Sequence, residues 1–223
     1  TKDAFGNNCD AGGAPITVNV SGPNDEKVKA NVKDNGDGTY DVDYQPKGTG
    51  DFVVDVKLDG DDIKENPFSV KVAPGKVVAG NSVASGDGLK EVVAGETGKF
   101  QVQTKDSNSN LCDFGGNSVT GVVKGPAEYT VDVKDNSNGT YDGSYVPTVA
   151  GKYKATVQVD GDAISGSPFG VTVVPAQAVA RETLASGKGL ENAVAGVKAG
   201  AVIQARDEFQ NESIHGGDTV SGT

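Results

Sequence analysis

The sequence predicts an all-β protein made of tandem immunoglobulin-like antiparallel β-sandwiches with seven strands each. Three observations predict this fold. Apolar and polar residues alternate along short segments, turn-forming residues separate those segments, and the whole pattern returns after about 100 residues. Alternation with a period of two is typical of strands that bury one face. No segment carries a convincing helical period.

The most complete copy of the pattern is expected to contain seven strands in order. The alternation is clearest where Phe100 and Val102 alternate with glutamines, and where Tyr153, Ala155 and Val157 alternate with polar residues. Seven short strands separated by Gly, Pro, Asn and Asp are typical of an immunoglobulin-like sandwich. The expected ranges are 76–79, 99–105, 118–124, 128–134, 140–146, 152–159 and 168–174.

Internal repeats define the expected domains. KDNGDGTY at 33–40 returns as KDNSNGTY at 134–141, and NPFSVKV at 66–72 returns as SPFGVTV at 167–173, both 101 residues later. TKD at 1–3 returns at 104–106, an offset of 103, so an insertion separates these blocks and marks a loop. ARDEF at 205–209 aligns with TKDSN at 104–108 and starts a third copy.

We therefore expect one complete repeat at 75–175, a repeat at 1–74 that lacks its first strands, and the front half of a further repeat at 176–223. Half a sandwich leaves strand edges and apolar faces that it cannot bury, so a segment of a longer tandem array is expected. A circularly permuted domain made from both ends is the alternative. In that arrangement residues 1–19 and 205–223 would compete for one place.

Composition excludes several classes of partner. The formal charge is −11, from 20 basic and 31 acidic residues, and a uniformly acidic surface repels nucleic acid and anionic lipid. No apolar run approaches the roughly 20 residues that cross a bilayer, so no membrane insertion is expected. Two cysteines cannot build a disulfide framework, which favours a reducing compartment.

The blocks of the second copy resemble a known family. KDNSNGTYDGSYVP at 134–147, GKY at 151–153, SPF at 167–169 and ASGKGL at 185–190 stand in the order and spacing of filamin and gelation-factor rod repeats. The match runs in register through every part of the chain. The resemblance implies sandwiches arranged as a rod, joined elsewhere in the parent chain to an actin-binding module, and nothing in these residues resembles that module.

The resemblance also implies a docking surface for peptides. In filamins the third strand accepts a peptide as an added strand and the fourth strand completes the groove, because an exposed sheet edge offers unpaired N–H and C=O groups. Those strands correspond to 118–124 and 129–133, and to 16–20 and 28–32 in the first copy. Gly121 has no side chain and is expected to admit a bulky side chain of the peptide. The alternative is an edge strand protected by its own charges and twist. The candidate docking residues are Ser118, Val119, Thr120, Gly121, Val122, Val123, Val131 and Val133.

The other candidate sites favour structural interpretations. KDNGDGTY contains acids and glycines, but counting from Asp34 as the first position of a calcium loop places Gly36, Gly38 and Gln45 where oxygen ligands are needed. The block is better explained as a tight hairpin, and the DGDD run at 59–62 as a solvated turn. DFGG at 113–116 has no accompanying kinase motif. We expect no metal and no cofactor.

An enzyme is not expected. Cys9 and Cys112 occupy equivalent positions, and Ser213 stands there in the third copy. The single histidine, His215, aligns beside neither cysteine, so a nucleophile with a general base is missing. Tyr153 is instead expected to bond the preceding loop as in the tyrosine corner of other Greek-key sandwiches, whereas Phe52 in the first copy cannot make that bond.

The expected function is that of a rod segment in an actin cross-linking cytoskeletal scaffold of the cytoplasm. It would act as a mechanical spacer with neighbouring repeats, and as a platform for peptides that add a strand. An alternative is a tandem immunoglobulin-like cell-surface adhesion or ligand-binding protein, for which NGT at 138–140 and NES at 211–213 fit the N-glycosylation pattern. A further alternative is the same repeat in a ciliary or microtubule assembly.

Overall fold

The computed structural model describes residues 1–214, 216–217 and 220–221. It divides into two compact units. The first unit contains Thr1–Lys76 together with the loop Asp106–Asn110, and the second contains Val77–Lys105 and Leu111–Thr223. In the described residues strands dominate, and the helical elements are 3-10 turns of three residues each, so the all-β prediction is confirmed.

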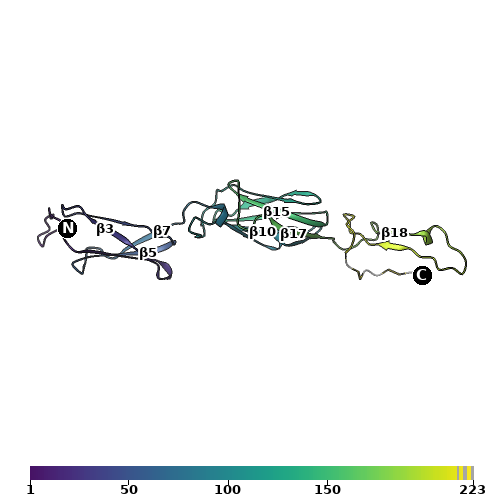
Figure 1. Cartoon of the computed structure of the whole chain (residues 1–223), viewed down its shortest axis with the longest axis horizontal. Coiled ribbons are helices and arrows are strands. Elements are labelled where there is room, and N and C mark those ends of the chain that lie inside the picture. Colours follow the sequence, from purple (N-terminus) through teal and green to yellow (C-terminus); the bar gives the residue numbers. More distant parts are fainter. Residues whose placement is uncertain (215, 218–219, 222–223) are drawn as a thin grey trace. The chain divides into compact units, whose positions relative to one another are not determined.

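The complete repeat in the second unit is a sandwich of two sheets. One sheet has the strand order β13-β14-β10-β8 and the other has β12-β11-β15-β17-β9, with β16 paired to β15. Figure 1 labels β10 in the first of these sheets and β15 and β17 in the second. All pairs are antiparallel except β17 with β9, which is parallel. The strands are β8 Val83–Ser85, β9 Glu91–Val93, β10 Gly98–Gln103, β11 Val119–Lys124, β12 Glu128–Thr130, β13 Asp132–Asp135, β14 Thr140–Tyr145, β15 Gly151–Val159, β16 Asp162–Ala163 and β17 Phe169–Val174.

The expected strand at 76–79 is wrong. Val77 is buried, but Ala79–Asn81 form a 3-10 turn because Gly80 and Asn81 interrupt the extended chain, and the first strand is β8. The short parallel strand β9 was not expected. The expected strand at 128–134 is divided at Val131, where the chain leaves one sheet and enters the other.

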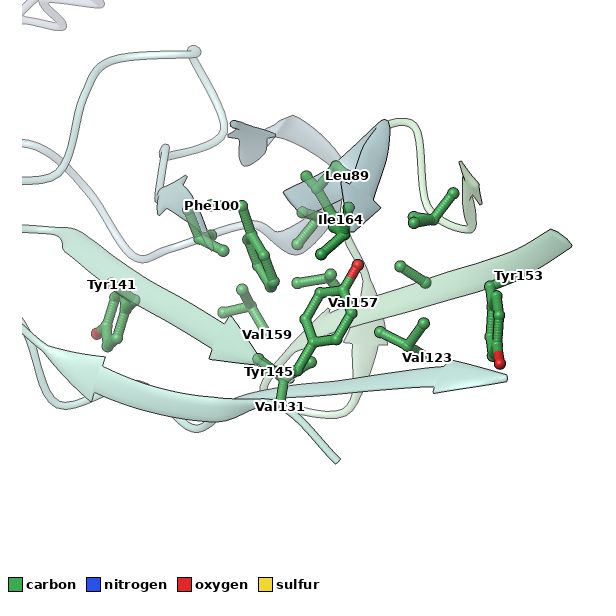
Figure 2. Packing of buried hydrophobic residues seen from close by; sticks show 14 of the residues in the cluster. Leu89, Phe100, Val123, Val131, Tyr141, Tyr145, Tyr153, Val157, Val159 and Ile164 are labelled. Atoms are coloured by element: carbon green, nitrogen blue, oxygen red, sulfur yellow. The ribbon is translucent and has the colours of Figure 1, made fainter. Parts of the chain in front are cut away.

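Alternating side chains build one continuous core in this repeat. Phe100, Val102 and the inward residues of β15 are buried, while their sequence neighbours face solvent or are only partly covered. Figure 2 shows Tyr145 pointing into the middle of this cluster, with Tyr141 and Tyr153 near its two ends. The Tyr145 hydroxyl donates to Gly88 O at 2.6 Å, and burial raises the pKa of Tyr145 to about 12.

The first unit holds the rear strands of a sandwich. One sheet has the order β2-β1-β5-β6 with β7 paired to β5, and β3 pairs with β4 as a hairpin. In the complete repeat β14 lies between β13 and β10, whereas β4 pairs with β3 alone in the described residues. Val32 and Val42 on this hairpin are therefore exposed. The strands are β1 Ile16–Ser21, β2 Lys27–Val28, β3 Ala30–Asp34, β4 Tyr40–Tyr44, β5 Gly50–Leu58, β6 Asp61–Asp62 and β7 Phe68–Val72, and the turn η1 is Pro23–Asp25.

The last segment of the second unit forms one short antiparallel pair, β18 Leu184–Ser186 with β19 Val202–Gln204, and the turn η4 Lys188–Leu190. These strands match β8 and β10 of the complete repeat in sequence. Leu184 and Val202 remain more than half exposed, because the described residues of this segment provide no opposite sheet.

Candidate partner-binding site

The edge of β11 is half covered. β12 pairs with Val122–Lys124, which leaves Val119–Gly121 beyond the end of β12. At the point where the chain changes sheets, Val131 N donates to Gly121 O at 2.9 Å. The main-chain groups of Gly121 therefore point away from β15. Residues two apart in a strand present these groups to the same side, so those of Val119 face the same open edge.

The opposite strand supports this assignment. Val157 lies opposite Gly121 in the register of β11 and β15. Its N–H donates to Ser167 Oγ at 3.0 Å and its carbonyl accepts from Ile164 N at 3.2 Å, so neither group bonds β11. Thr120, between Val119 and Gly121, is consequently the residue whose main-chain groups face β15.

Val131 occupies the space in front of Gly121. A Cβ atom added to Gly121 would lie 2.8 Å from Val131 Cγ2, closer than real Cβ contacts. The structure brings Gly121 and Val131 together, with Val133 following on β13 and partly buried. A peptide side chain placed against Gly121 would first have to displace Val131.

The other residues of the expected docking set differ in their exposure to solvent. Ser118 precedes β11, and its N–H donates to Asp160 Oδ1 at 2.9 Å. Thr120 is exposed and Val122 is half-buried, but Val123 is fully buried in the core. The first copy repeats the pattern: β2 covers only Val20 and Ser21 of β1.

The hairpin block KDNGDGTY uses its acids as caps for main-chain groups. Asp34 accepts from Gly36 N at 2.8 Å and from Gly13 N at 2.6 Å. Asp135 in the second copy accepts from Ser137 N and Gly116 N, each at 2.7 Å. Carboxylates that accept main-chain N–H groups fix a turn. Within the described residues no group of three or more metal-ligating side chains comes together.

The tyrosine hydroxyl bond predicted for the complete repeat is confirmed. Tyr153 Oη donates to Val149 O at 2.7 Å. Tyr129 holds the same loop from the other side, since its hydroxyl oxygen accepts from Thr148 N at 3.1 Å and from Val149 N at 3.0 Å. The two rings are 5.8 Å apart between centroids. Burial raises the pKa of Tyr153 to about 12.

The first copy holds the equivalent loop differently. Phe52 is fully buried in the place of Tyr153. Glu26 takes the role of Tyr129, because its carboxylate accepts from Lys47 N at 3.1 Å and from Gly48 N at 3.1 Å. One loop is thus held by a carboxylate in one copy and by two phenols in the other.

The cysteines occupy structural positions. Cys112 is buried and Cys9 is half-buried. Cys112 N donates to Thr104 O at 3.0 Å, and Gly139 packs so closely on Cys112 O that an added Cβ would lie 1.8 Å from it. Phe114 of the DFGG string is partly exposed. His215 lies outside the described residues.

Sequence reasoning missed the aspartates that start three similar loops. Asp207 is fully buried, and its carboxylate accepts from Ala176 N, Phe209 N and Asn211 N, each at 2.9 Å, and from Asn211 Nδ2 at 2.8 Å. Burial acts to raise the pKa of Asp207, but these hydrogen bonds outweigh it and hold the pKa below its ordinary value. The signal available in the sequence was the recurrence of Asp-x-x-x-Asn at 3–7, 106–110 and 207–211.

None of the helical elements in the described part of the chain has the length and hydrophobicity to cross a membrane.

Comparison with known proteins identifies the module. The family model described as "Filamin/ABP280 repeat" matches residues 1–69 and 76–170. Filamin-C of Rattus norvegicus is 34% identical over 167 residues, which are 74% of this chain and 6% of that protein. Filamin-A of Drosophila melanogaster is 32% identical over 157 residues, 70% of this chain and 7% of that protein. The chain thus spans only a small part of the length of these relatives.

A solved structure supports the fold. The Escherichia coli adhesin FdeC superposes with a TM-score of 0.60 at 20% identity, covering 96% of this chain and 68% of that one. At this identity the likeness concerns the fold alone. The Lin-41 filamin domain is 27% identical with a TM-score of 0.39, covering 46% of this chain and 97% of that domain.

The filamin repeat is a structural module, and the sequence blocks, the two-sheet sandwich and the family match lead to one conclusion: this chain belongs to the filamin repeat family.

Proposed function

We propose that this chain is a rod segment of an actin cross-linking scaffold in the cytoplasm, where it spaces the actin-binding ends and presents a strand-docking edge to peptides. Family membership supports the scaffold role. The formal charge of −11 supports a spacer role. Actin is itself acidic, so electrostatic repulsion opposes binding of an acidic rod along the filament. Co-sedimentation of the full parent protein with actin filaments, with microtubules as the comparison, tests this role.

The docking role rests on one observation, the uncovered half of the β11 edge. Val119 presents its N–H and C=O to this edge and Gly121 its N–H, because Gly121 O already accepts from Val131 N; the ladder from β11 to β15 remains intact. An extended peptide could add beside Val119–Gly121 and place alternate side chains against Val131 and Val133. β13 forms the edge of the other sheet, so the added strand would lie between the free edges of the two sheets.

A proline substitution separates edge docking from simple loss of folding. Val119→Pro removes one N–H from the open edge and leaves the bonds of Thr120 to β15 in place. Ile16→Pro is the matched control, since Ile16 opposes Leu58 in the first copy as Val119 opposes Val159 in the second. The probe is a set of extended peptides of about eight residues, selected by phage display on the Ile16→Pro chain, so that the equivalent edge of the first copy is already blocked during selection.

The expected result is that selected peptides bind the wild type and Ile16→Pro and lose at least about tenfold in affinity for Val119→Pro, as expected when the main-chain bonds of an added strand are lost. Amide NMR shifts on binding should map to Val119–Gly121 and Val131. Equal binding by Val119→Pro would refute docking at this edge. Carbohydrate on Asn138 of the natural protein would contradict the cytoplasmic role.

A further inference from the structure

Three loops of the chain share one internal design, and we name them the Asp–Asn loops: residues 3–7, 106–110 and 207–211. In each, the aspartate carboxylate accepts the N–H groups of the residues two and four positions later, and the asparagine side chain donates back to the same carboxylate. The loop is therefore a preformed element and does not depend on a partner for its shape.

The loop at 207–211 shows what this element contacts. Asn211 Nδ2 donates to Thr148 O at 2.9 Å, and Ala150 N donates to Asn211 Oδ1 at 2.8 Å. Phe209 packs on the core cluster of the complete repeat and lies over Gly95. These contacts lie within the second unit. We name the receiving surface, formed by Gly95, Thr148 and Ala150, the repeat end.

The asparagine of the loop at 207–211 contacts the repeat end through main-chain atoms. Asn211 donates to Thr148 O and accepts from Ala150 N, so both of its partners in the loop at 148–150 are main-chain atoms. A Cβ atom at Gly95 would lie 2.5 Å from Phe209 Cε2, and Gly95 has a φ of +82°. Glycine is thus required there both for its backbone conformation and for the approach of the aromatic ring.

A second loop repeats the asparagine contact. Asn110 Nδ2 donates to Lys47 O at 2.7 Å within the first unit, and Lys47 is equivalent to Thr148. Asn108 stands in this loop where Phe209 stands in the other. The asparagine contact therefore recurs, and the aromatic contact is an addition to it.

The loop at 3–7 has both groups. Phe5 is equivalent to Phe209 and Asn7 to Asn211, and Asp3 accepts from Phe5 N and Asn7 N, each at 2.9 Å. Phe5 is 90% exposed, whereas Phe209 is partly buried. A preformed loop that holds a phenylalanine in water carries a free-energy cost that docking would recover.

We propose that the Asp–Asn loop at 3–7 is a connector that docks on the repeat end of another filamin-type repeat. The partner is defined by its chemistry: a glycine at positive φ for the ring of Phe5, and a Pro-x-x-x-Gly loop whose carbonyl and N–H meet the amide of Asn7. This inference rests on the proposed spacer role, because docked connectors limit the bending between neighbouring repeats. It concerns a different surface from the β11 edge.

The first experiment calibrates the contact in the chain itself. Hydrogen exchange of the segments 93–98 and 147–151 is measured for the wild type, Phe209→Ala and Phe114→Ala. Phe114 is a partly exposed phenylalanine outside the loops and serves as the control. Phe209→Ala should speed exchange of these segments at least about fivefold, because the loop loses the apolar contact of the ring with the repeat end. Unchanged exchange would show that the loop does not hold the repeat end, and would overturn the inference.

The second experiment supplies a partner to Phe5. A second copy of residues 75–204 is joined ahead of Thr1, which keeps the register because Ala205 and Thr1 are equivalent. The added copy contains the complete repeat with its own core. In this extended chain Phe5→Ala and Asn7→Ala should each speed exchange at the repeat end of the added copy about fivefold, with Phe114→Ala without effect.

Phe5→Ala leaves the first unit folded, because its ring is exposed there. Equal exchange in the extended chain with Phe5 and with Phe5→Ala would refute docking of this loop. Val119→Pro in the same chain should leave the repeat end unchanged, so failure of the connector and failure of strand docking are separate outcomes.

Discussion

The hydroxyl of Tyr153 gives the sharpest test of the physical reasoning about the complete repeat. Tyr153 is 3% exposed and donates to Val149 O at 2.7 Å. Tyr153→Phe removes this hydrogen bond and keeps the ring, at a net cost of about 1 kcal/mol. For a domain of roughly 100 residues that cost lowers the Tm by about 4–8 °C. The first unit, with Phe52 at this position, should be unaffected.

The pH dependence provides an internal control. Burial raises the pKa of Tyr153 to about 12, and a tyrosine in the unfolded chain titrates near pH 10. A phenol with the higher pKa in the folded state contributes stability that is complete below pH 10 and is lost as the pH rises towards 12, at about 1.4 kcal/mol per unit. Tyr153→Phe has no such titration, so its deficit should close near pH 11.

Urea unfolding at pH 7, 9 and 11, followed by the methyl NMR signals of Val157 and Val159 on β15, measures this difference for the complete repeat alone. The expected deficit of the variant is about 1 kcal/mol at pH 7 and 9 and close to zero at pH 11. A deficit that stays the same at all three pH values would refute the account of burial, and no deficit at pH 7 would refute the account of the hydrogen bond.

Four further substitutions test the loops. Gly139→Ala should lower the free energy of unfolding by about 2–5 kcal/mol, because Gly139 has a φ of +80° and the added Cβ would overlap Cys112 O. Gly161→Ala should lower it by only about 1–2 kcal/mol, because Gly161 has a φ of +90° but open space around the added Cβ. Thermal unfolding of the two variants measures this difference. Asp207 has a lowered pKa, so its stabilisation is present above about pH 4 and is lost as the pH falls through the folded value. Other carboxylates with lowered pKa values, such as Asp142, lose stabilisation in acid too, so urea unfolding at pH 6 and pH 2.5 should show a smaller loss of stability in Asp207→Asn than in the wild type. Asp135→Ala removes two main-chain caps and should lower the stability of the complete repeat by about 1–2 kcal/mol in urea unfolding, while a change below 0.5 kcal/mol would contradict the capping role.

Much of the sandwich could be predicted because its strands are half buried. Phe100 and Val102 alternate with polar residues, and β10 and β15 lie within one or two residues of their expected bounds. The strand predicted near Val77 was wrong because a buried valine beside other apolar residues gives the same sequence pattern as a strand. The hydrogen bond from Val78 N to Lys105 O joins residues far apart in the sequence, so the local pattern does not report it.

The sequence was sufficient to locate the candidate docking edge, but not to predict which side chain fills the space in front of it. Alternation places Gly121 on an inward face, yet only the sheet change at Val131 shows what fills the space before it. The hydrogen bonds of Asp207 to distant main-chain groups could not be predicted for the same reason. In the sequence Asp207 resembles a solvent-exposed acid, and its partner Ala176 lies 31 residues earlier. No local propensity reports such a contact.

The two ways of holding the Pro-x-x-x-Gly loop bear on how such repeats diverge. Glu26 and Tyr129 perform one task, but strand pairing aligns Tyr129 with Val28, and Glu26 lies two residues earlier in the segment where the copies differ in length. Replacing Tyr129 by the aligned Val28 would remove the hydrogen bonds of the phenol to the loop without supplying those of Glu26. In this chain the fourth strand and the loop that it holds therefore form one unit, and a recombination of these two repeats should move both together.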